Sequence, residues 1–87
     1  MPDTPRRAKD RMLKRRYGLR IGEFDKMLEA QKGLCALCDK PMRRINVDHD
    51  HKTNRIRGLL CSGCNMTLGF LEPRVKLLPK IFGYLGK

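Results

Sequence analysis

Two C-x₂-C pairs restrict the fold of this chain more than any other feature of its sequence. The pairs are Cys35 with Cys38 and Cys61 with Cys64. Two residues between ligands let a tight turn direct both thiolates at one ion, and four thiolates complete the tetrahedral shell that zinc prefers. Two disulfides or four unrelated thiols are the alternative, but adjacent pairs at this spacing are typical of a metal site. We therefore predict one structural zinc ion bound by all four cysteines.

The small size of the chain explains why it needs such an ion. Its 87 residues suffice for one small domain, and they include three phenylalanines, two tyrosines and no tryptophan. A domain of this size buries about 60–65% of the surface that its unfolded chain exposes, so its core alone gives marginal stability. Bound structural zinc contributes on the order of 10 kcal/mol, which is comparable with the net stability of a whole small domain.

The charge of the chain predicts a polyanionic partner. Its formal net charge is +11 and its isoelectric point is about 10.1, which favours DNA or another nucleic acid. A basic surface that serves only solubility is the alternative. The side chains that we expect to contact phosphates are Arg6, Arg7, Arg11, Lys14, Arg15, Arg16, Arg43, Arg44, Lys52 and Arg55.

The beginning of the chain differs in composition from the rest. Residues 6–16 are mostly basic, so we expect them to contact phosphates rather than to pack in a core. Thr4 and Pro5 are typical of a helix start and Gly18 of a helix end, while a disordered basic arm is the alternative. We therefore divide the chain into a basic N-terminal helix or arm, residues 1–18, and a zinc-bound domain, residues 19–87.

The sequence also bears on the compartment. It shows no secretory signal and no apolar run of about 18 residues, the length that a membrane helix needs. Cysteines in close pairs suit a reducing compartment, where metal binding is commoner than disulfide formation. We therefore expect a cytoplasmic protein without a membrane partner.

Hydrophobic periodicity predicts a helix followed by a hairpin. Residues 21–32 carry apolar side chains at helical spacing, and Gly33 is suited to end that helix. Alternating apolar residues predict short strands at 43–49 and 56–60, joined by a loop. Within the second strand, Gly58 indicates a bulge or a close backbone approach.

The last third of the chain is predicted to be helical with interruptions. A helix starts at Ser62 or Gly63, and Pro73 interrupts it. Pro79 then either starts a new helix or kinks the old one. Because the tail is apolar at helical spacing, we expect it to close the core or to pair with a second copy in a homodimer.

A run of histidines and aspartates, V-D-H-D-H at 47–51, lies between the cysteine pairs. The Asp48 carboxylate and the amide oxygen of Asn65, which follows a cysteine, are hard ligands of the kind that Mg²⁺ or Mn²⁺ prefers. Neutral His49 is then suited to accept a proton from a water molecule that attacks phosphorus. The alternatives are that His49 and His51 bind zinc, or that they lie in a charged surface turn.

Four segments together resemble the phage recombination endonuclease VII family, within the wider His-Me finger (ββα-metal, HNH-like) nucleases. They are Q-K-G-L-C-A-L-C (31–38), V-D-H-D-H (47–51), I-R-G-L-L-C (56–61) and C-N-M-T-L-G (64–69). The resemblance implies a small, zinc-stabilised α+β fold with a ββα-metal core between N- and C-terminal helices. It also implies a phage or prophage origin in a bacterial host.

The same resemblance assigns roles to individual residues. It makes His49 the general base, and it makes Asp48 and Asn65 the ligands of a catalytic Mg²⁺ or Mn²⁺ ion. It gives His51 a supporting catalytic role, either near the phosphate or in orienting the residues that bind the metal ion. Arg57 becomes a phosphate contact or a residue that stabilises the transition state.

The activity implied by this resemblance is a metal-dependent DNA endonuclease. It would use a single catalytic ion and leave 5′-phosphate and 3′-hydroxyl ends. Asn46 stands where the junction-resolving member of the family carries another histidine, so we expect nicking or double-strand cleavage rather than junction resolution. A structure-selective junction resolvase and a non-catalytic, zinc-dependent DNA-binding module are the alternatives. Because the base must be neutral imidazole, the rate is expected to fall as the pH decreases.

Overall fold

The computed structural model describes residues 4–87 and shows an elongated molecule with a hairpin at its centre. Residues 1–3, which belong to the predicted N-terminal unit, lie outside this range. The Cα positions extend over 59 × 27 × 19 Å. In chain order the elements are α1 (Pro5–Tyr17), α2 (Ile21–Ala30), β1 (Asn46–His49), β2 (Ile56–Leu60), α3 (Ser62–Leu71), the 3₁₀ helix η1 (Glu72–Leu77) and α4 (Leu78–Leu85). The predicted small α+β architecture is confirmed.

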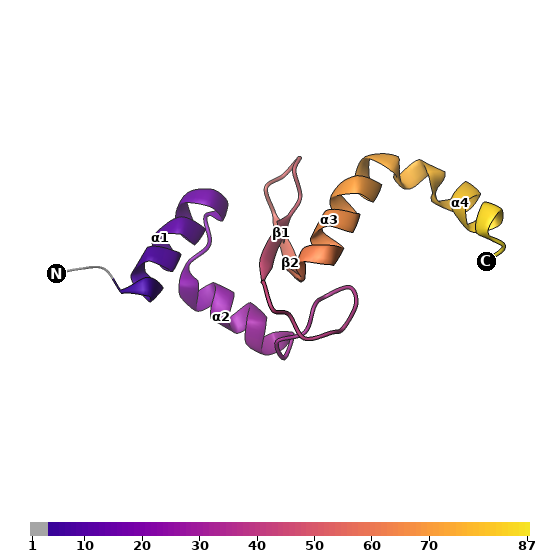
Figure 1. The fold of residues 1–87 in the computed structure, drawn as a ribbon. Helices are drawn as coiled ribbons and strands as arrows, with labels where there is room; N and C mark the ends of the chain where they lie inside the picture. The colour runs from indigo at the N-terminus through magenta and orange to yellow at the C-terminus, as the bar shows by residue number, and fades with distance from the viewer. Residues whose placement is uncertain (1–3) are drawn as a thin grey trace.

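The elements form layers around the hairpin. Figure 1 shows α1 and α2 on one side of β1 and β2, and α3 on the other side. From the end of α3, η1 and α4 lead away from these layers, so α1 and α4 lie at opposite ends of the molecule.

The basic N-terminal segment forms a helix and not a disordered arm. Thr4 Oγ1 accepts a hydrogen bond from the Arg7 N–H at 3.2 Å, and Pro5 stands in the first turn of α1. Gly18 ends α1 with a φ of +66°, a left-handed conformation that glycine adopts without a Cβ clash. The expectation that this segment stays out of the core is wrong, because Leu13 is only 2% exposed. Leu13, together with the partly buried Met12 and Tyr17, therefore packs this basic helix against the core.

A single buried cluster joins the first four elements. Its members are Leu13 of α1, Leu19 of the next turn, Phe24 of α2, Val47 of β1 and Leu59 of β2. Val47 is paired with Leu59 across the ladder, so both side chains point to the same face of the hairpin. That face therefore packs on α1 and α2, and the opposite face is turned towards α3 (Figure 1).

Asp10 of α1 fixes the start of α2. Its Oδ1 accepts a hydrogen bond from the Ile21 N–H at 2.8 Å, and the Arg20 guanidinium lies beside it. The Ile21 N–H and the Arg20 charge hold the pKa of the Asp10 carboxyl below its ordinary value. A carboxylate at this place also suits the partial positive charge of a helix N-terminus.

The antiparallel ladder of β1 and β2 contains one extra residue. Asp48 is paired with Gly58, but the next residue, His49, is paired with Ile56, so Arg57 is the extra residue of a β-bulge. A bulge bends its strand and changes the direction of the side chain that it carries. The sequence predicted a bulge or a close backbone approach at Gly58; the ladder does contain a bulge, but it lies at the adjacent Arg57, and Gly58 itself stays paired. A Cβ at this glycine would lie 3.5 Å from the nearest side-chain atom, an ordinary contact.

The C-terminal helices lead away from the core. Helix α3 begins at Ser62, as predicted, and Pro73 stands in the first turn of η1. Pro79 stands in the first turn of α4 and therefore starts a new helix. No residue of η1 or α4 is buried, and Tyr84 is 90% exposed. Closure of the core by this tail is thus a wrong prediction, whereas pairing with a second copy stays a prediction.

None of the helices in residues 4–87 has the length and apolar character to cross a membrane.

Candidate metal centre and hydrolytic site

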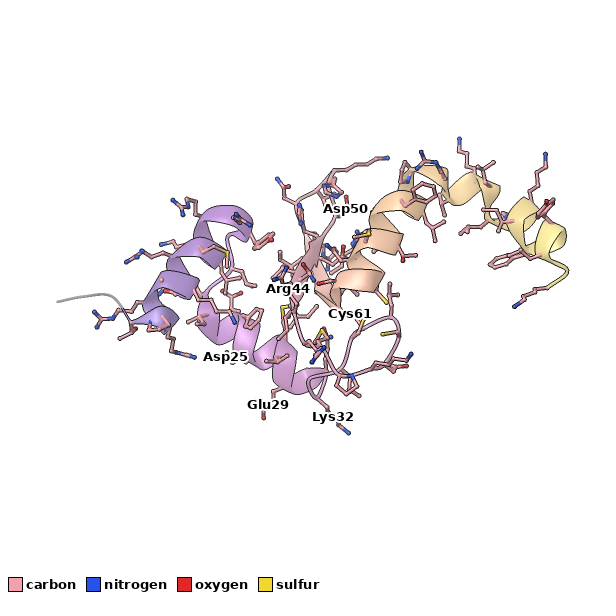
Figure 2. The ribbon with its side chains drawn as sticks, viewed as in Figure 1. Asp25, Glu29, Lys32, Arg44, Asp50 and Cys61 are labelled. Atoms are coloured by element: carbon pink, nitrogen blue, oxygen red, sulfur yellow. The ribbon has the colours of Figure 1, made fainter. Side chains whose placement is uncertain are left out.

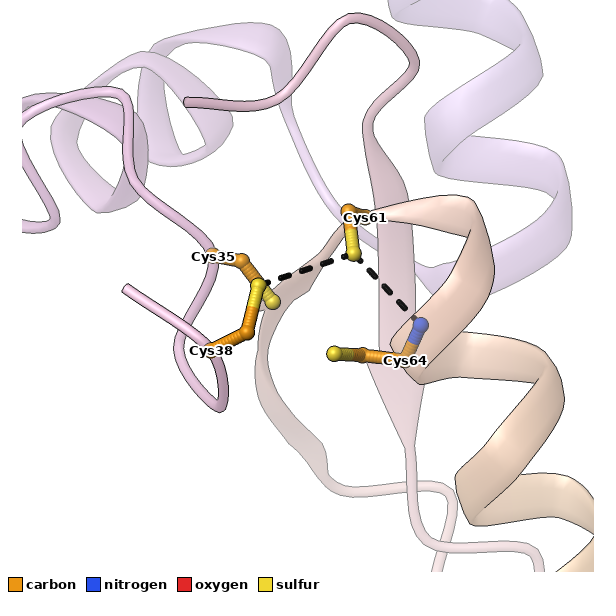
Figure 3. Close-up of side chains that lie close together, drawn as sticks. All are labelled: Cys35, Cys38, Cys61 and Cys64. Carbon is orange, nitrogen blue, oxygen red and sulfur yellow. Dashed lines mark hydrogen bonds between the residues drawn. The ribbon is translucent and has the colours of Figure 1, made fainter. Parts of the chain in front are cut away.

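The two cysteine pairs come together beside the N-terminus of α3 (Figure 3). Their four sulfur atoms all lie within 4.8 Å of one another, and Cys38 Sγ is 3.9 Å from Cys61 Sγ. Tetrahedral zinc with Zn–S bonds of about 2.3 Å holds its sulfur ligands about 3.8 Å apart. Within residues 4–87 no other group of three or more cysteine, histidine or acidic side chains is arranged in this way. The four cysteines are therefore arranged to bind a metal ion, and their spacing fits zinc.

A backbone turn between α2 and β1 positions the first pair. The Cys35 N–H donates to the Lys40 carbonyl at 2.9 Å, and the Asp39 N–H donates to the Cys35 carbonyl at 3.0 Å. Asp39 has a φ of +59°, a left-handed conformation that aspartate tolerates better than most residues. The Leu37 N–H lies 3.5 Å from Cys35 Sγ. This turn brings Cys38 back to the sulfur of Cys35.

The second pair is positioned by the start of α3. Cys61 is the N-cap of this helix, and its Sγ accepts a hydrogen bond from the Cys64 N–H at 3.4 Å (Figure 3). The Asn65 N–H then donates to the Cys61 carbonyl at 2.9 Å, which closes the first turn. The positive end of a helix favours the thiolate form of a cysteine placed there. One residue, Cys61, thus serves both the metal centre and the helix.

Gln31 connects the cysteine loop to the hairpin. Its Nε2 donates to the carbonyls of Leu34 at 2.8 Å and Leu59 at 3.0 Å, and its Oε1 accepts from the Leu59 N–H at 2.9 Å. The Ala36 N–H also donates to the Leu59 carbonyl, at 3.1 Å. These bonds satisfy backbone groups on the edge of β2 that β1 does not pair.

Burial and hydrogen bonding change the pKa values of two of the thiols in opposite directions. Burial by itself raises the pKa of Cys35, but N–H groups of Cys38, Cys61 and Leu37 donate to its sulfur and lower that pKa to about 6. A hydrogen bond with Cys61, together with burial, raises the pKa of Cys64 to about 12. Neighbouring thiols resist ionising together because their charges repel. A bound cation removes this repulsion.

The side chain of Asp48 is held by Arg57. Arg57 Nε donates to Asp48 Oδ2 at 2.8 Å, and its Nη2 donates to Oδ1 at 3.0 Å, which forms a two-bond fork. The same guanidinium donates to both carboxylate oxygens of Glu72, at 2.8 and 3.1 Å. Glu72 and then Asp48 raise the pKa of Arg57, and Arg57 lowers the pKa of Glu72. One cationic side chain thus lies between two carboxylates.

The donor set at Asp48 still fits a hard divalent cation. An ionised carboxylate offers roughly four lone-pair positions, and the Arg57 fork uses two of them. The Asn65 side chain is exposed and makes no hydrogen bond within residues 4–87, so its amide oxygen is open to a ligand. The structure therefore brings Asp48 and Arg57 together, while Asn65 makes no polar contact with either.

The ring of His49 packs against Tyr17 of α1 and against His51. Its ring centroid lies 5.5 Å from that of Tyr17 at an interplanar angle of 58°, and 4.8 Å from that of His51 at 61°. A pocket of about 270 Å³ is lined by His49, Tyr17, Arg16 and Asn54. Two of the predicted catalytic residues, His49 and His51, are therefore in contact, and an arginine lies at the same pocket.

The predicted phosphate contacts are all exposed and occupy three places. They lie on α1, in the loop before β1 and in the loop of the hairpin. Arg6 pairs with Asp25 at 2.7 Å. Arg16 and Arg44 line a groove of about 200 Å³ between α1 and β1, and Figure 2 shows Arg44 beside the hairpin. Of these ten residues, Arg16 also lines the pocket of His49.

Comparison with known proteins assigns the chain to a family. Residues 10–87 match the family described as recombination endonuclease VII. The chain belongs to this family. The Gene 59 protein of Mycobacterium phage D29 is 39% identical over 75 residues, and that of Mycobacterium phage L5 is 38% identical over 73 residues. The alignments cover 82% and 79% of this chain but 46% and 44% of the relatives, so the chain spans less than half of their length. No solved structure matches it significantly.

Three residues of this recombination endonuclease VII family member have contacts that the sequence analysis did not predict. Glu72 pairs with Arg57, Gln31 joins the cysteine loop to β2, and Asn46 Nδ2 donates to Ser62 Oγ at 3.2 Å. Asn46 therefore ties β1 to the start of α3. Gln31 follows the last residue of α2 at helical spacing from the apolar residues of that helix. This position was a usable signal, because a polar residue in line with an apolar stripe needs a partner. No feature of the sequence around Glu72 indicated its contact with Arg57.

Proposed function

We propose that this chain is a metal-dependent DNA endonuclease that hydrolyses phosphodiester bonds and leaves 5′-phosphate and 3′-hydroxyl ends. The observation that carries the proposal is the family match over residues 10–87, which includes Asp48, His49 and Asn65 between and beside the cysteine pairs. The high positive charge of the chain supports DNA as the substrate.

We assign zinc to the cysteine cluster. Four thiolates fill the tetrahedral shell, so this ion has no open position for a substrate and serves folding. The cluster joins the loop after α2, the end of β2 and the first turn of α3. Zinc therefore determines how α3, which carries Asn65, stands against the hairpin.

His49 is the proposed general base. Its imidazole accepts a proton from the water molecule that attacks phosphorus, and it must be neutral to do so. The rings of Tyr17 and His51 restrict the orientation of His49. Asp48 and Asn65 would hold a single Mg²⁺ or Mn²⁺ ion, which stabilises negative charge on phosphate oxygens when bound.

Basic side chains around His49 are the proposed phosphate contacts. Arg16 lines the pocket of His49, and together with Lys9 and Arg44 it lines the neighbouring groove between α1 and β1. Arginine and lysine in such a groove bind the DNA backbone, which positions the duplex without reading its sequence. Arg57 remains a candidate for stabilising charge at the phosphate.

One observation favours the alternative of a non-catalytic DNA-binding module. Both carboxylate oxygens of Asp48 are engaged by Arg57, as in an ion pair that serves only structure. In that case the hairpin would be held by Arg57, and the chain would bind DNA without cutting it. The two functions differ in whether Asp48 has a role in hydrolysis.

The deciding experiment incubates zinc-loaded protein with supercoiled plasmid, with and without added Mg²⁺ or Mn²⁺. The divalent ion is withheld rather than chelated, because a chelator would also remove zinc. We expect ion-dependent open-circular or linear DNA, and we expect Asp48→Asn to abolish it. Asp25→Asn is the matched control, since it removes the same charge from an exposed pair on α2. A gel shift without cutting under every ion would support the DNA-binding module instead.

A further inference from the structure

Glu72 connects the end of α3 to the strand that carries Arg57. It is the first residue of η1 and directly follows α3, and Pro73 comes next. Its carboxylate accepts two hydrogen bonds from Arg57, and its side chain is 37% exposed. Asp48, the other partner of Arg57, is more buried, at 12% exposure. The two carboxylates therefore differ in their access to solvent.

The charge of Arg57 is shared between these carboxylates. Asp48 accepts hydrogen bonds from Nε and Nη2, and Glu72 accepts them from Nη1 and Nη2. The three side chains together carry one net negative charge. Without the charge of Glu72, Arg57 and Asp48 would form a neutral pair. A neutral pair attracts a divalent cation less strongly than a negatively charged cluster does.

One member of this cluster, Glu72, lines a cleft. The cleft has a volume of about 770 Å³ and lies between the hairpin loop and the junction of α3 with η1. Asp50 and His51 line one wall, and Glu72 and Lys76 line the other. Glu72 therefore lies on the same cleft as His51, one of the proposed catalytic residues.

We propose that Glu72 is a positioning residue for the divalent cation that Asp48 binds. It shares the guanidinium of Arg57, so that Arg57 competes less with the cation for Asp48, and it keeps the site negatively charged. Glu72 acts through Arg57 and is not required to touch the cation. This inference rests on the proposed function, because it takes Asp48 as a ligand of the catalytic ion.

The test measures Mn²⁺ binding to zinc-loaded protein without DNA, by the electron paramagnetic resonance signal of free Mn²⁺. We expect Glu72→Gln to raise the Kd for Mn²⁺ about tenfold, as is usual when a charged partner of a metal ligand is removed. Glu72→Asp keeps the charge and is expected to restore most of the affinity. Glu29→Gln is the control, because Glu29 is exposed on α2 and points away from the hairpin (Figure 2). It is expected to leave the Kd unchanged.

A double-mutant cycle tests whether Glu72 acts through Arg57. In an Arg57→Ala background, Glu72→Gln is expected to cause a much smaller loss of Mn²⁺ affinity, because only the attraction of its charge through space is left to lose. The same tenfold loss in both backgrounds would make Glu72 a direct ligand and would overturn the positioning role. An unchanged or lower Kd in Glu72→Gln alone would also overturn it.

Asp48→Ala separates this inference from the proposed function. Loss of Mn²⁺ binding in Asp48→Ala, with a normal Kd in Glu72→Gln, would remove the role of Glu72 and leave the catalytic site in place. Equal Mn²⁺ affinity of Asp48→Ala and the unaltered chain would contradict both the role of Glu72 and the assignment of Asp48 as a ligand of the catalytic ion. Zinc content and the melting temperature of each variant show whether it is folded.

Discussion

The cysteine cluster and the Asp48 side of the hairpin lie within one short part of the chain, yet they are built in different ways. In the cluster, backbone turns and the N-terminus of α3 place four sulfur atoms within 4.8 Å of one another. At Asp48, the carboxylate is engaged by Arg57, and Asn65 lies on α3 without a polar contact to it. The first arrangement is already complete for a metal ion, whereas the second is held by ion pairs.

This difference implies that the two proposed ions would be bound with different permanence. Backbone geometry forms the cluster as the chain folds, so its ion belongs to the folded state. Ion pairs of partly exposed side chains are weak and exchange readily with solvent ions. A cation at Asp48 would therefore bind reversibly and exchange with ions in solution, as a catalytic ion that binds together with its substrate does. Each prediction below tests one side of this comparison.

The largest effect is expected from Cys61→Ser. This change removes a thiolate ligand, whereas the serine hydroxyl is still suited to cap α3. The expected loss is therefore that of zinc binding, which is worth on the order of 10 kcal/mol to a small domain. We expect loss of bound zinc and of the cooperative thermal transition, measured by metal analysis and circular dichroism. Zinc added back to metal-free protein should restore the transition only in the unaltered chain. A variant that melts normally would show that the cluster is not a folding site.

His49→Ala tests the hydrolytic side. Removing a general base is expected to lower the nicking rate by about 10²–10⁴-fold. Zinc content, melting temperature and DNA binding should stay close to those of the unaltered chain, because the His49 side chain contacts only rings at the surface of the core. His51→Ala is expected to cost less, since His51 is assigned a supporting role. Lost DNA binding with residual cutting would contradict the assignment.

Gln31→Ala sharpens the comparison because it disturbs the scaffold of the cluster without removing a ligand. The change leaves the N–H of Leu59 and the carbonyl of Leu34 without their partner, at a cost of about 1–3 kcal/mol. We expect lower stability in urea and faster zinc loss to a chelator, with normal cutting once Mg²⁺ is saturating. Glu29→Ala on the exposed face of α2 is the control. Equal stability of the two variants would mean that the turn forms without Gln31.

The smallest effect is expected from acid. Arg57 lowers the pKa of Glu72 below its ordinary value of 4.5, so this ion pair stabilises the fold above pH 4.5. The stabilisation is lost as the pH falls through the lower pKa of the folded state, because Glu72 then takes up a proton. We expect the melting temperature of Glu72→Gln to depend less on pH below 4.5 than that of the unaltered chain. Parallel curves would mean that the pair adds no stability in solution.

Features with a local cause were predictable from the sequence. The strand at 56–60 and the start of α3 at Ser62 follow directly from alternation and from the cysteine spacing, and the structure confirms both. The four metal-binding cysteines were predictable for the same reason. The first strand begins at Asn46 rather than at 43, because residues before it are held in the cysteine loop by the bridge of Leu34 with Pro41.

Features that depend on tertiary contacts were not predictable. Leu13 stands among basic residues, and only the position of α1 against the hairpin shows that it is buried. The contact of Arg57 with Glu72 requires both the bulge in β2 and the end of α3. The sequence left two arrangements open for the C-terminal helix, and only the structure shows that it does not cover the core. The catalytic roles of Asp48, His49 and Asn65 remain predictions.

The bulge at Arg57 has a consequence for deletion variants. Removing this one residue would leave Asp48 opposite Gly58 and His49 opposite Ile56, which is the register of a regular ladder. The shortened hairpin would therefore still fold, but it would lose the guanidinium between Asp48 and Glu72. Most single deletions inside a strand shift the register and turn the following side chains to the wrong face. Here the ladder already contains one residue that its register does not need.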